Sequence, residues 1–324
     1  MRALVTGAAG FIGSHVATAL AAAGADVRGF DRAEPAEPPP GAEHVTGDVR
    51  DRAALERAID GCDAVFHLAA LYSYDRSDGA AMAAVNVDGT RAVLDAAARG
   101  TTARRVIHTS SCATCGPVEG RAATEADGPP PWELAIPYKR TKLAGERLAL
   151  RAAEDGLDVV VLNPTTPVGP GDRAPTPTGK MVADVATGRA RAYLAGGALN
   201  VVAVEDVATG HRLAYERGSA GERYLLGGEN LEMREVFAIV AEAVGRRPPR
   251  VPVPWHLAYA AARLAELGLG VLGREPSLLV LDEVRLARLP MNFDDAKARR
   301  ELGYRPRPAA EALAAAGRAA LQRR

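Results

Sequence analysis

Residues 2–20 read RALVTGAAGFIGSHVATAL, and this stretch decides the fold. It begins with a short apolar run, residues 2–6, that is typical of a buried parallel strand. Three glycines follow at a GxxGxxG spacing, namely Gly7, Gly10 and Gly13. Because helical periodicity then extends over residues 11–23, the order of elements is strand, glycine turn and helix. That order indicates a dinucleotide-binding site, with an ordinary turn as the alternative interpretation.

Each glycine has its own expected role. Gly7 allows the tight turn, Gly10 lets the backbone approach a pyrophosphate, and Gly13 lets the helix pack close to the strand. The pyrophosphate would lie at the positive N-terminus of the helix, next to Phe11 and Ile12.

The composition narrows the classes of function. The chain has 324 residues, 48% of them hydrophobic, which is enough to bury a sizeable core. Lysine plus arginine and aspartate plus glutamate both total 40, so we expect neither nucleic acid nor an anionic membrane as a partner. Met1 runs straight into the first strand, so no signal peptide is expected, and three cysteines favour a reducing cytoplasm.

Two further features have competing interpretations. Cys112 and Cys115 form a single CxxC without a second pair or metal-spaced histidines, so we expect packing residues, not a redox or metal site. The apolar stretch 255–272, interrupted by Arg263 and Glu266, is short for a membrane span. We expect no integral membrane segment here but a buried or amphipathic helix; a helix lining the entry for an apolar substrate is the alternative.

Strands and helices alternate in the first half of the chain. Strands are predicted at residues 2–6, 26–30, 43–46, 64–67, 105–109 and 158–162, and helices at 11–23, 52–59 and 82–98, with a further helix that carries Tyr138. The expected fold class is therefore α/β, a Rossmann-type doubly wound parallel sheet. Ligands bind such sheets at the carboxyl ends of the strands. The glycine turn, HLAA (67–70), TSS (109–111) and NPTTP (163–167) follow predicted strands and should share one crevice.

The second half of the chain has a different pattern of predicted elements. After a loop rich in proline and glycine, helices are predicted at residues 207–215, 233–244, 255–267, 279–287 and 294–302. We expect a dinucleotide-binding domain over residues 1–164 and a smaller, mainly helical substrate lobe over 165–324. The two should be partly interleaved, with a strand and a helix of the lobe returning to the sheet.

Tyr138 and Lys142 stand four residues apart in the run IPYKRTKLAGE. That spacing is one helical turn, so both side chains leave the same face of a helix. A phenol has an ordinary pKa of about 10, and a neighbouring ammonium favours the phenolate and lowers that pKa. The pair could then take a proton from an alcohol or return one to a carbonyl oxygen.

Taken together, these motifs resemble the extended short-chain dehydrogenase/reductase (NAD-dependent epimerase/dehydratase) family over nearly the whole chain. The resemblance is carried by TGAAGFIG, GDVRD, HLAA, VNVDGT, TSS, YKRTK, NPTTPVGPGD, VEDVATGH, GERYLLGGENL and AKARRELGYRP, in this order. Within the family the chain looks most like the dihydroflavonol-4-reductase-like branch. The runs YKRTK, NPTTPVGPGD and PTPTGK are most similar to proteins called hopanoid-associated sugar epimerases.

The resemblance implies three catalytic residues. Tyr138 would be the acid/base, and Lys142 would bind the nicotinamide ribose and lower the pKa of Tyr138. Ser111 would hydrogen-bond the reacting oxygen, with Ser110 as the alternative; a capped strand end is the structural interpretation of both serines. The implied cofactor-binding residues also include Asp48, Val49, Leu68, Ala69, Ala70, Thr109, Asn163, Pro164, Thr165 and Thr166.

Two of the implied residues have structural alternatives. Asp48 would meet the adenine, but it could also be a helix N-cap before Arg52. Asn86 is expected to orient a helix or an active-site water, and not to react.

Asp31 ends the second predicted strand, 18 residues after Gly13. A carboxylate there accepts hydrogen bonds from the ribose 2′-hydroxyl and repels a 2′-phosphate, which favours NAD. The adjacent Arg32 could hold a 2′-phosphate, so NADP stays the alternative cofactor.

The residues around the catalytic motif limit the reactions that the protein could catalyse. Sugar 4,6-dehydratases of the resembled family carry a Thr-Asp-Glu set where this chain has Ser111, Cys112 and Ala113, so dehydration is rejected. Sugar-nucleotide epimerases need arginines for a diphosphate, yet residues 198–202 contain none, and the context of Arg285 and Arg288 does not match. Two basic residues, Lys180 and Arg189, could hold another anion or simply face solvent.

We therefore predict an NAD(P)-dependent oxidoreductase that transfers hydride at a secondary alcohol or ketone of a sugar-like, polyol or isoprenoid-linked small molecule. A sugar epimerase with tightly bound NAD and a transient keto intermediate is the alternative, and a non-catalytic NAD(P)-sensing protein is a remote one. A homodimer is expected through Ala144, Leu148 and the helix at 82–98. The substrate pocket could be lined by Tyr72, Tyr74, Trp132 and Tyr193, although each could be structural.

Overall fold

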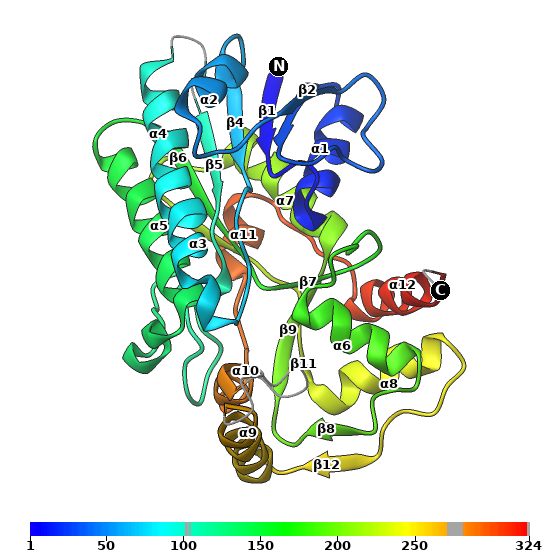
Figure 1. Ribbon diagram of the computed structural model, residues 1–324. Coiled ribbons are helices and arrows are strands. Elements are labelled where there is room, and N and C mark those ends of the chain that lie inside the picture. The colour runs from blue at the N-terminus through cyan, green and yellow to red at the C-terminus, as the bar shows by residue number, and fades with distance from the viewer. Residues whose placement is uncertain (101–102, 104, 271–280, 323–324) are drawn as a thin grey trace.

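Figure 1 shows the computed structural model of the chain. The structure describes every residue except 101–102, 104, 271–280 and 323–324.

The central element is a parallel sheet of seven strands in the order β10-β6-β5-β4-β1-β2-β3. The strands are β1 (Arg2–Thr6), β2 (Asp26–Asp31), β3 (Glu43–Thr46), β4 (Ala64–His67), β5 (Arg105–Thr109), β6 (Asp158–Pro164) and β10 (Arg223–Leu226). All six predicted strands are present, and the expected doubly wound α/β fold is confirmed. The strand order reverses beside β1, because the chain passes from β1 through β2 to β3 and then returns to β4 on the other side. This switch point is where such sheets bind ligands.

Helices cover both faces of the sheet because successive side chains of a strand point to opposite sides. Ala3 and Val5 of β1 pack in one core cluster with α1 (Phe11–Ala22) and α7 (Val204–Arg217). Leu4, between them in sequence, packs in a second cluster with α2 (Arg52–Ile59), α4 (Thr90–Arg99) and α5 (Pro137–Glu154). In Figure 1, α4 and α5 lie together on one side of the sheet, and α1 and α7 lie on the other.

The helix expected at 82–98 is not one regular helix. It consists of α3 (Gly79–Ala83), a π-helical turn (Ala84–Gly89) and α4. The wide turn contains Asn86, whose side chain exchanges two hydrogen bonds with the backbone of Leu71. The periodicity of the sequence could not reveal this bulge, because π turns shift the helical phase by only one residue.

The second half contains two small sheets that were not predicted. One has the order β11-β9-β7, and the other pairs β12 with β8. Their strands are β7 (Thr166–Val168), β8 (Ala192–Leu194), β9 (Ala198–Ala203), β11 (Glu229–Glu232) and β12 (Val251–Val253). The prediction of a mainly helical lobe missed these strands, of which β7 and β12 each contain a proline, a residue that argues against a strand.

The remaining helices are α6 (Pro177–Ala186), α8 (Met233–Ala243), α9 (Trp255–Gly270), α10 (Leu281–Leu286), α11 (Ala296–Glu301) and α12 (Ala309–Gln322). They agree with the predicted helices apart from shifted ends and α6 and α12, which were not expected. Residues 271–272 and 279–280 of two predicted helices lie outside the described part of the chain. No helix among the described residues is long and apolar enough to cross a membrane.

Residues after 164 contribute to the central sheet as well as to the lobe. Strand β10 pairs in parallel with β6, and α7 covers β5 and β6. A separate core cluster holds α6, α8 and α12 together around β9. The division at residue 164 itself stays a prediction.

Candidate functional site

The glycine turn after β1 requires two of its glycines. Gly7 has a φ of +74°, and a Cβ on it would lie 2.7 Å from the backbone nitrogen of Ala69. A Cβ on Gly13 would lie 1.9 Å from the carbonyl oxygen of Gly7, so no side chain fits between helix and strand. The predicted roles of both glycines therefore have a direct steric cause.

The turn fits the pyrophosphate of a dinucleotide. Gly10 is the N-cap of α1, no side chain caps the helix there, and no acidic residue lies in the first turn. Phe11 and Ile12 begin the helix, so their backbone N–H groups and the positive end of the helix dipole are available to an anion.

The carboxylate of Asp31 makes a structural contact besides its predicted role in binding the ribose. Its Oδ2 accepts a hydrogen bond from the backbone N–H of Ala9 at 3.0 Å, which ties the end of β2 to the glycine turn. Its Oδ1 accepts a longer one from Ala33 at 3.3 Å. Arg32 beside it is exposed. Asp31 thus lies next to the glycine turn, and its role in reading the ribose stays a prediction.

Asp48 is not the helix N-cap that was considered as an alternative. Asp51 caps α2 by accepting from Ala54 N–H, whereas Asp48 forms a two-pronged ion pair with Arg50, with distances of 2.9 and 2.6 Å. The hydrogen bonds from Arg50 hold the pKa of Asp48 at about 2 against the effect of burial. Sequence reasoning missed Arg50, a second guanidinium besides Arg32 near the predicted adenine end.

The predicted residues after β4 lie directly over the glycine turn. Leu68 and Ala69 are the backbone neighbours that a Cβ on Gly7 would strike, and Ala69 N–H donates to Thr6 Oγ1 at 3.3 Å. Ala70 follows them and is exposed. Val49 is buried, and a Cβ on Gly89 would lie 2.8 Å from one of its methyl groups.

Tyr138 and Ser111 come together at the carboxyl ends of the strands. Ser111 follows β5, and its Oγ accepts from Ala113 N–H at 3.2 Å, so its position is fixed by the turn. Tyr138 is the second residue of α5, and its phenol lies near enough to the Ser111 hydroxyl for that group to lower its pKa. Ser110 Oγ is buried without a hydrogen-bond partner among the described residues, so Ser110 stays the alternative.

Lys142 lies one turn deeper on the same helix face. It is 7% exposed, and its Nζ donates to the carbonyl oxygen of Thr109, the last residue of β5, at 2.8 Å. Burial lowers the pKa of Lys142 to about 8. The Thr109 hydroxyl in turn bonds the ring of the buried His211 at 2.8 Å, so this strand end is held from both sides.

The expected lowering of the Tyr138 pKa is wrong for this structure. Burial raises the pKa of Tyr138 to about 12, and the nearby Ser111 hydroxyl offsets only part of the rise. The rings of Tyr72 and Tyr74 pack against Tyr138, while the ammonium of Lys142 is directed at Thr109 instead. At neutral pH Tyr138 is therefore a proton donor.

Two of the four predicted pocket aromatics accompany Tyr138. The ring centroid of Tyr72 lies 4.4 Å from that of Tyr138, and that of Tyr74 lies 6.1 Å away. Tyr193 instead packs against Phe237 in the lobe. Trp132 is 42% exposed and makes no ring contact among the described residues.

A buried polar network below the site was missed by sequence reasoning. Asn163, at the end of β6, donates to the carbonyl oxygen of Ser111 at 3.1 Å and to Glu146 Oε2 at 2.6 Å. Glu146 follows Lys142 by four residues, the same spacing that separates Tyr138 from Lys142. That repeated spacing was the signal that could have found it.

The residues after Asn163 continue along the same edge. Pro164 ends β6, and the side chains of Thr165 and Thr166 are buried there. Asn86 bonds Leu71 and Thr141 of α5, which agrees with its expected orienting role.

The cysteines favour the packing interpretation. None of the three forms a disulfide, and burial raises the pKa of both Cys112 and Cys115 to about 12, so neither is a thiolate near neutral pH. Within the described part of the chain, no group of three or more His, Cys, Asp or Glu side chains could hold a metal ion.

The basic residues considered for anion binding have different surroundings. Arg189 pairs with Asp184 at 2.7 Å, and Arg285 pairs with Asp282 at 3.1 Å. Arg288 lies over the ring of Trp255 at 5.7 Å. Lys180 is exposed on α6.

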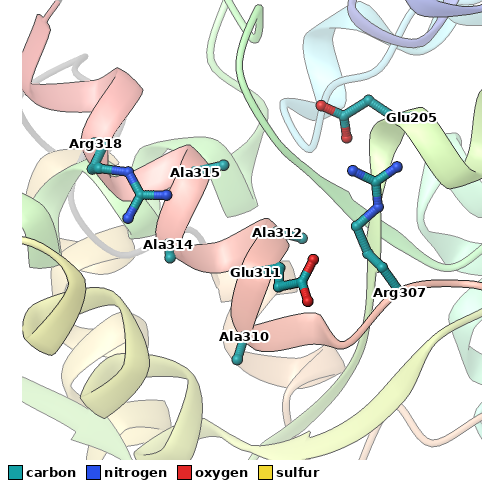
Figure 2. Close-up of a pocket in the computed structure, with 8 residues that line it drawn as sticks. All are labelled: Glu205, Arg307, Ala310, Glu311, Ala312, Ala314, Ala315 and Arg318. Atoms are coloured by element: carbon teal, nitrogen blue, oxygen red, sulfur yellow. The ribbon is translucent and has the colours of Figure 1, made fainter.

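A groove with a volume of about 510 Å³ lies elsewhere, along α12 (Figure 2). Four alanines of α12 line it together with Glu205, Arg307, Glu311 and Arg318. The guanidinium of Arg307 points toward Glu205 in Figure 2, and it forms an ion pair with Asp206 at 2.9 Å. None of the predicted site residues lines this groove, so it is separate from the predicted site at the strand ends.

The parallel doubly wound sheet, with its glycine turn at the switch point, defines a Rossmann-type dinucleotide-binding protein. Residues 3–227, more than half of the chain, match the family model for the NAD dependent epimerase/dehydratase family. The chain therefore belongs to this family and is an NAD-dependent enzyme of the extended short-chain dehydrogenase/reductase type. The expected family is confirmed; the closer likeness to hopanoid-associated sugar epimerases stays a prediction.

Two relatives and one solved structure show the extent of the similarity. A putative dihydroflavonol 4-reductase of Synechocystis is 37% identical over 320 residues, which cover 96% of this chain and 92% of the relative. Sterol demethylase protein B of Methylococcus capsulatus is 35% identical over 310 residues, 94% of each chain. The crystal structure of gox2253 superposes with a TM-score of 0.84 at 37% identity, covering 99% of this chain and 98% of that one.

Proposed function

We propose that this protein is a net oxidoreductase that reduces a ketone to a secondary alcohol, or reverses that reaction, with Ser111, Tyr138 and Lys142 as its catalytic residues. The observation that carries the proposal is that Tyr138 on α5 lies near Ser111 at the carboxyl end of β5, while Lys142 on the same helix face donates to Thr109 at that strand end. The buried ammonium of Lys142 lies one helical turn below them.

Each side chain has a defined part in the proposed reaction. When bound, NAD supplies the hydride acceptor or, in its reduced form, the hydride donor. Ser111 donates a hydrogen bond to the reacting oxygen, and Tyr138 gives its Oη proton to that oxygen as the carbonyl carbon is reduced. Because the pKa of Tyr138 is raised to about 12, the phenol holds its proton at neutral pH, which supports the reductive direction. The ammonium of Lys142 binds the ribose hydroxyls.

The residues that face Tyr138 support a substrate with a ring or an extended apolar part. Tyr72 and Tyr74 offer aromatic surface at the reacting end. No arginine lies in residues 198–202, where a diphosphate would need one, so we favour an isoprenoid-linked or sugar-like alcohol without a nucleotide. The similarity to a dihydroflavonol reductase and to a sterol demethylase protein supports this choice.

The test is the variant Tyr138→Phe. Wild type and variant are incubated with NADH or NADPH and a panel of ring-bearing ketones, and the loss of reduced nucleotide is followed by its absorbance. The variant should lose roughly 10²–10⁴-fold in kcat because it keeps the ring but lacks the transferable proton. Turnover that survives the change would overturn the catalytic assignment.

A sugar epimerase with retained NAD is the alternative that the family name supports. Mass spectrometry of nucleotide released from the freshly purified, denatured protein separates the two. Stoichiometric NAD favours an epimerase, because it regenerates its cofactor, whereas an empty protein that binds added NADH reversibly favours net reduction. A protein that binds nucleotide but turns over no member of the panel would support the sensing alternative.

A homodimer through α4 and α5 stays a prediction, which sedimentation would test. A cytoplasmic location also stays a prediction.

A further inference from the structure

Glu146 is a buried carboxylate on the helix that carries the proposed catalytic residues. It is 1% exposed and lies one turn after Lys142 and two turns after Tyr138, on the same face of α5. Its Oε2 accepts from Thr114 Oγ1 at 2.7 Å and from Asn163 Nδ2 at 2.6 Å. A charge so deeply buried persists only when it is paired and hydrogen-bonded, so these contacts are strongly constrained.

The partners of Glu146 are also the residues that hold Ser111. Thr114 N–H donates to the Ser111 carbonyl oxygen at 3.1 Å, and Asn163 Nδ2 lies at 3.1 Å from the same oxygen. The Thr114 hydroxyl lies within reach of both Ser111 O and the Glu146 carboxylate, but it has one proton, and the carboxylate is the stronger acceptor.

Glu146 also fixes which way the Asn163 amide points. If that amide were turned over, its oxygen would lie 2.6 Å from a carboxylate oxygen, which is repulsive. The nitrogen must therefore face Glu146, and from this position it also reaches the Ser111 carbonyl.

The same carboxylate acts electrostatically on Lys142. Burial lowers the pKa of Lys142 to about 8, and the negative charge of Glu146 works against that lowering. The charged and titratable groups around Glu146 are Lys142 on α5, Arg223 of β10, whose Nε lies 3.3 Å from Oε1, and the Cys115 thiol, which Arg223 contacts. Glu125 in turn acts on Arg223.

We infer that Glu146 is a positioning residue: it holds Ser111 in place through Thr114 and Asn163, and its charge supports the ammonium of Lys142. The inference rests on the proposed function of Ser111, Tyr138 and Lys142. Glu146 touches none of the reacting atoms, so it acts only through these other side chains.

The chain allows a direct test of the electrostatic part, because it has only four lysines: Lys139, Lys142, Lys180 and Lys297. Carbon NMR of protein labelled at lysine Cε follows each amine through a pH titration, and Lys142→Met identifies the Lys142 signal. Glu146→Gln should lower the Lys142 midpoint by roughly one pH unit, because the opposing charge is removed. The matched control is Glu154→Gln, on the same helix but exposed, which should leave the midpoint unchanged. An unchanged midpoint in Glu146→Gln would overturn this part.

The hold on Ser111 is tested by Thr114→Val, which keeps the shape of the side chain and removes its hydroxyl. We expect kcat to fall about tenfold with NADH affinity and the Lys142 midpoint unchanged, since Glu146 keeps its charge. This variant also keeps the inference falsifiable if Glu146→Gln does not fold. A kcat equal to that of Glu154→Gln would contradict the positioning role.

The measurements separate an error in the role of Glu146 from an error in the proposed function. If Tyr138→Phe is inactive while Glu146→Gln matches Glu154→Gln in kcat and in the Lys142 titration, the proposed function stands and the role of Glu146 is wrong. If Tyr138→Phe keeps its turnover, the proposed function is wrong whatever the lysine titration gives.

Discussion

The rings of Tyr72 and Tyr138 lie with their centroids 4.4 Å apart and their planes inclined by 51°. Tyr72 comes from the segment after β4, and Tyr138 from the start of α5, so the contact joins two parts of the chain that are 66 residues apart. It has a chemical consequence, because aromatic surface around the phenol disfavours the phenolate. The ring of Tyr72 thus covers the proposed acid, Tyr138, and also helps to raise its pKa.

Removing that cover should alter both binding and acidity. We expect Tyr72→Ala to raise KM for ring-bearing ketones by about tenfold, since a lost aromatic contact is worth about 1 kcal/mol or more. It should also move to lower pH the loss of kcat that follows deprotonation of Tyr138, which lies above the loss near pH 8 due to Lys142, because Tyr138 becomes better hydrated. Tyr72→Phe, which keeps the ring, is the control and should resemble wild type. Steady-state kinetics across pH measures both effects, and equal behaviour of the two variants would refute the role of the ring.

Alanine variants of two glycines should separate the steric need for glycine at position 13 from the conformational need for it at position 24. Gly13→Ala places a Cβ where the structure leaves 1.9 Å to the carbonyl oxygen of Gly7, so the turn must open and NAD binding should be lost. Gly24 has a φ of +84° but open space around it. Its alanine variant should therefore lose only about 1–2 kcal/mol of stability and still bind NAD.

Calorimetry with NAD and urea unfolding of both glycine variants are the measurements. Normal NAD affinity in Gly13→Ala would show that the close approach of helix and strand is not needed.

Nucleotide preference should depend on the charge of Asp31. Asp31→Asn keeps an oxygen that can accept from Ala9 N–H but removes the negative charge, so the preference should move toward NADPH by about tenfold. Asp31→Ala should weaken both nucleotides as well, because the turn loses its tie to β2. Fluorescence titrations with NADH and NADPH give the ratio. If Asp31→Asn keeps the wild-type ratio, Arg32 and Arg50 decide the preference instead.

Three buried histidines should make the fold sensitive to acid. Burial lowers the pKa of His67 to about 3 and that of His211 to about 4, and it lowers that of His108 as well. Below pH 6.5 the unfolded chain binds protons that the folded protein excludes, so stability falls as the pH falls toward 4. Each histidine contributes a slope of up to about 1.4 kcal/mol per pH unit in this window.

Guanidinium unfolding between pH 7 and pH 5 measures that slope. His211→Gln should reduce it by about one histidine's share, whatever the variant does to stability at neutral pH. A slope equal to that of wild type would mean that His211 is protonated in the folded protein.

Much of the fold follows from local sequence patterns. The apolar runs and the GxxGxxG turn predict all six strands of the first half, because strand burial and glycine geometry are properties of neighbouring residues. The small strands β7, β8, β9, β11 and β12 were not predicted; β7 and β12 each contain a proline, which argues against a strand.

For the site, the sequence by itself determined that Tyr138 and Lys142 share a helix face, because helical spacing is local. Only the tertiary structure decided the pKa values of these two groups. The expected lowering of the Tyr138 pKa became a rise, since the residues that pack around the phenol, Tyr72 among them, come from elsewhere in the chain. Likewise the role of Glu146 depends on Thr114, Asn163 and Arg223, which folding alone brings together. Spacing within one element is fixed by sequence, whereas dielectric surroundings and hydrogen-bond partners are set by packing between elements.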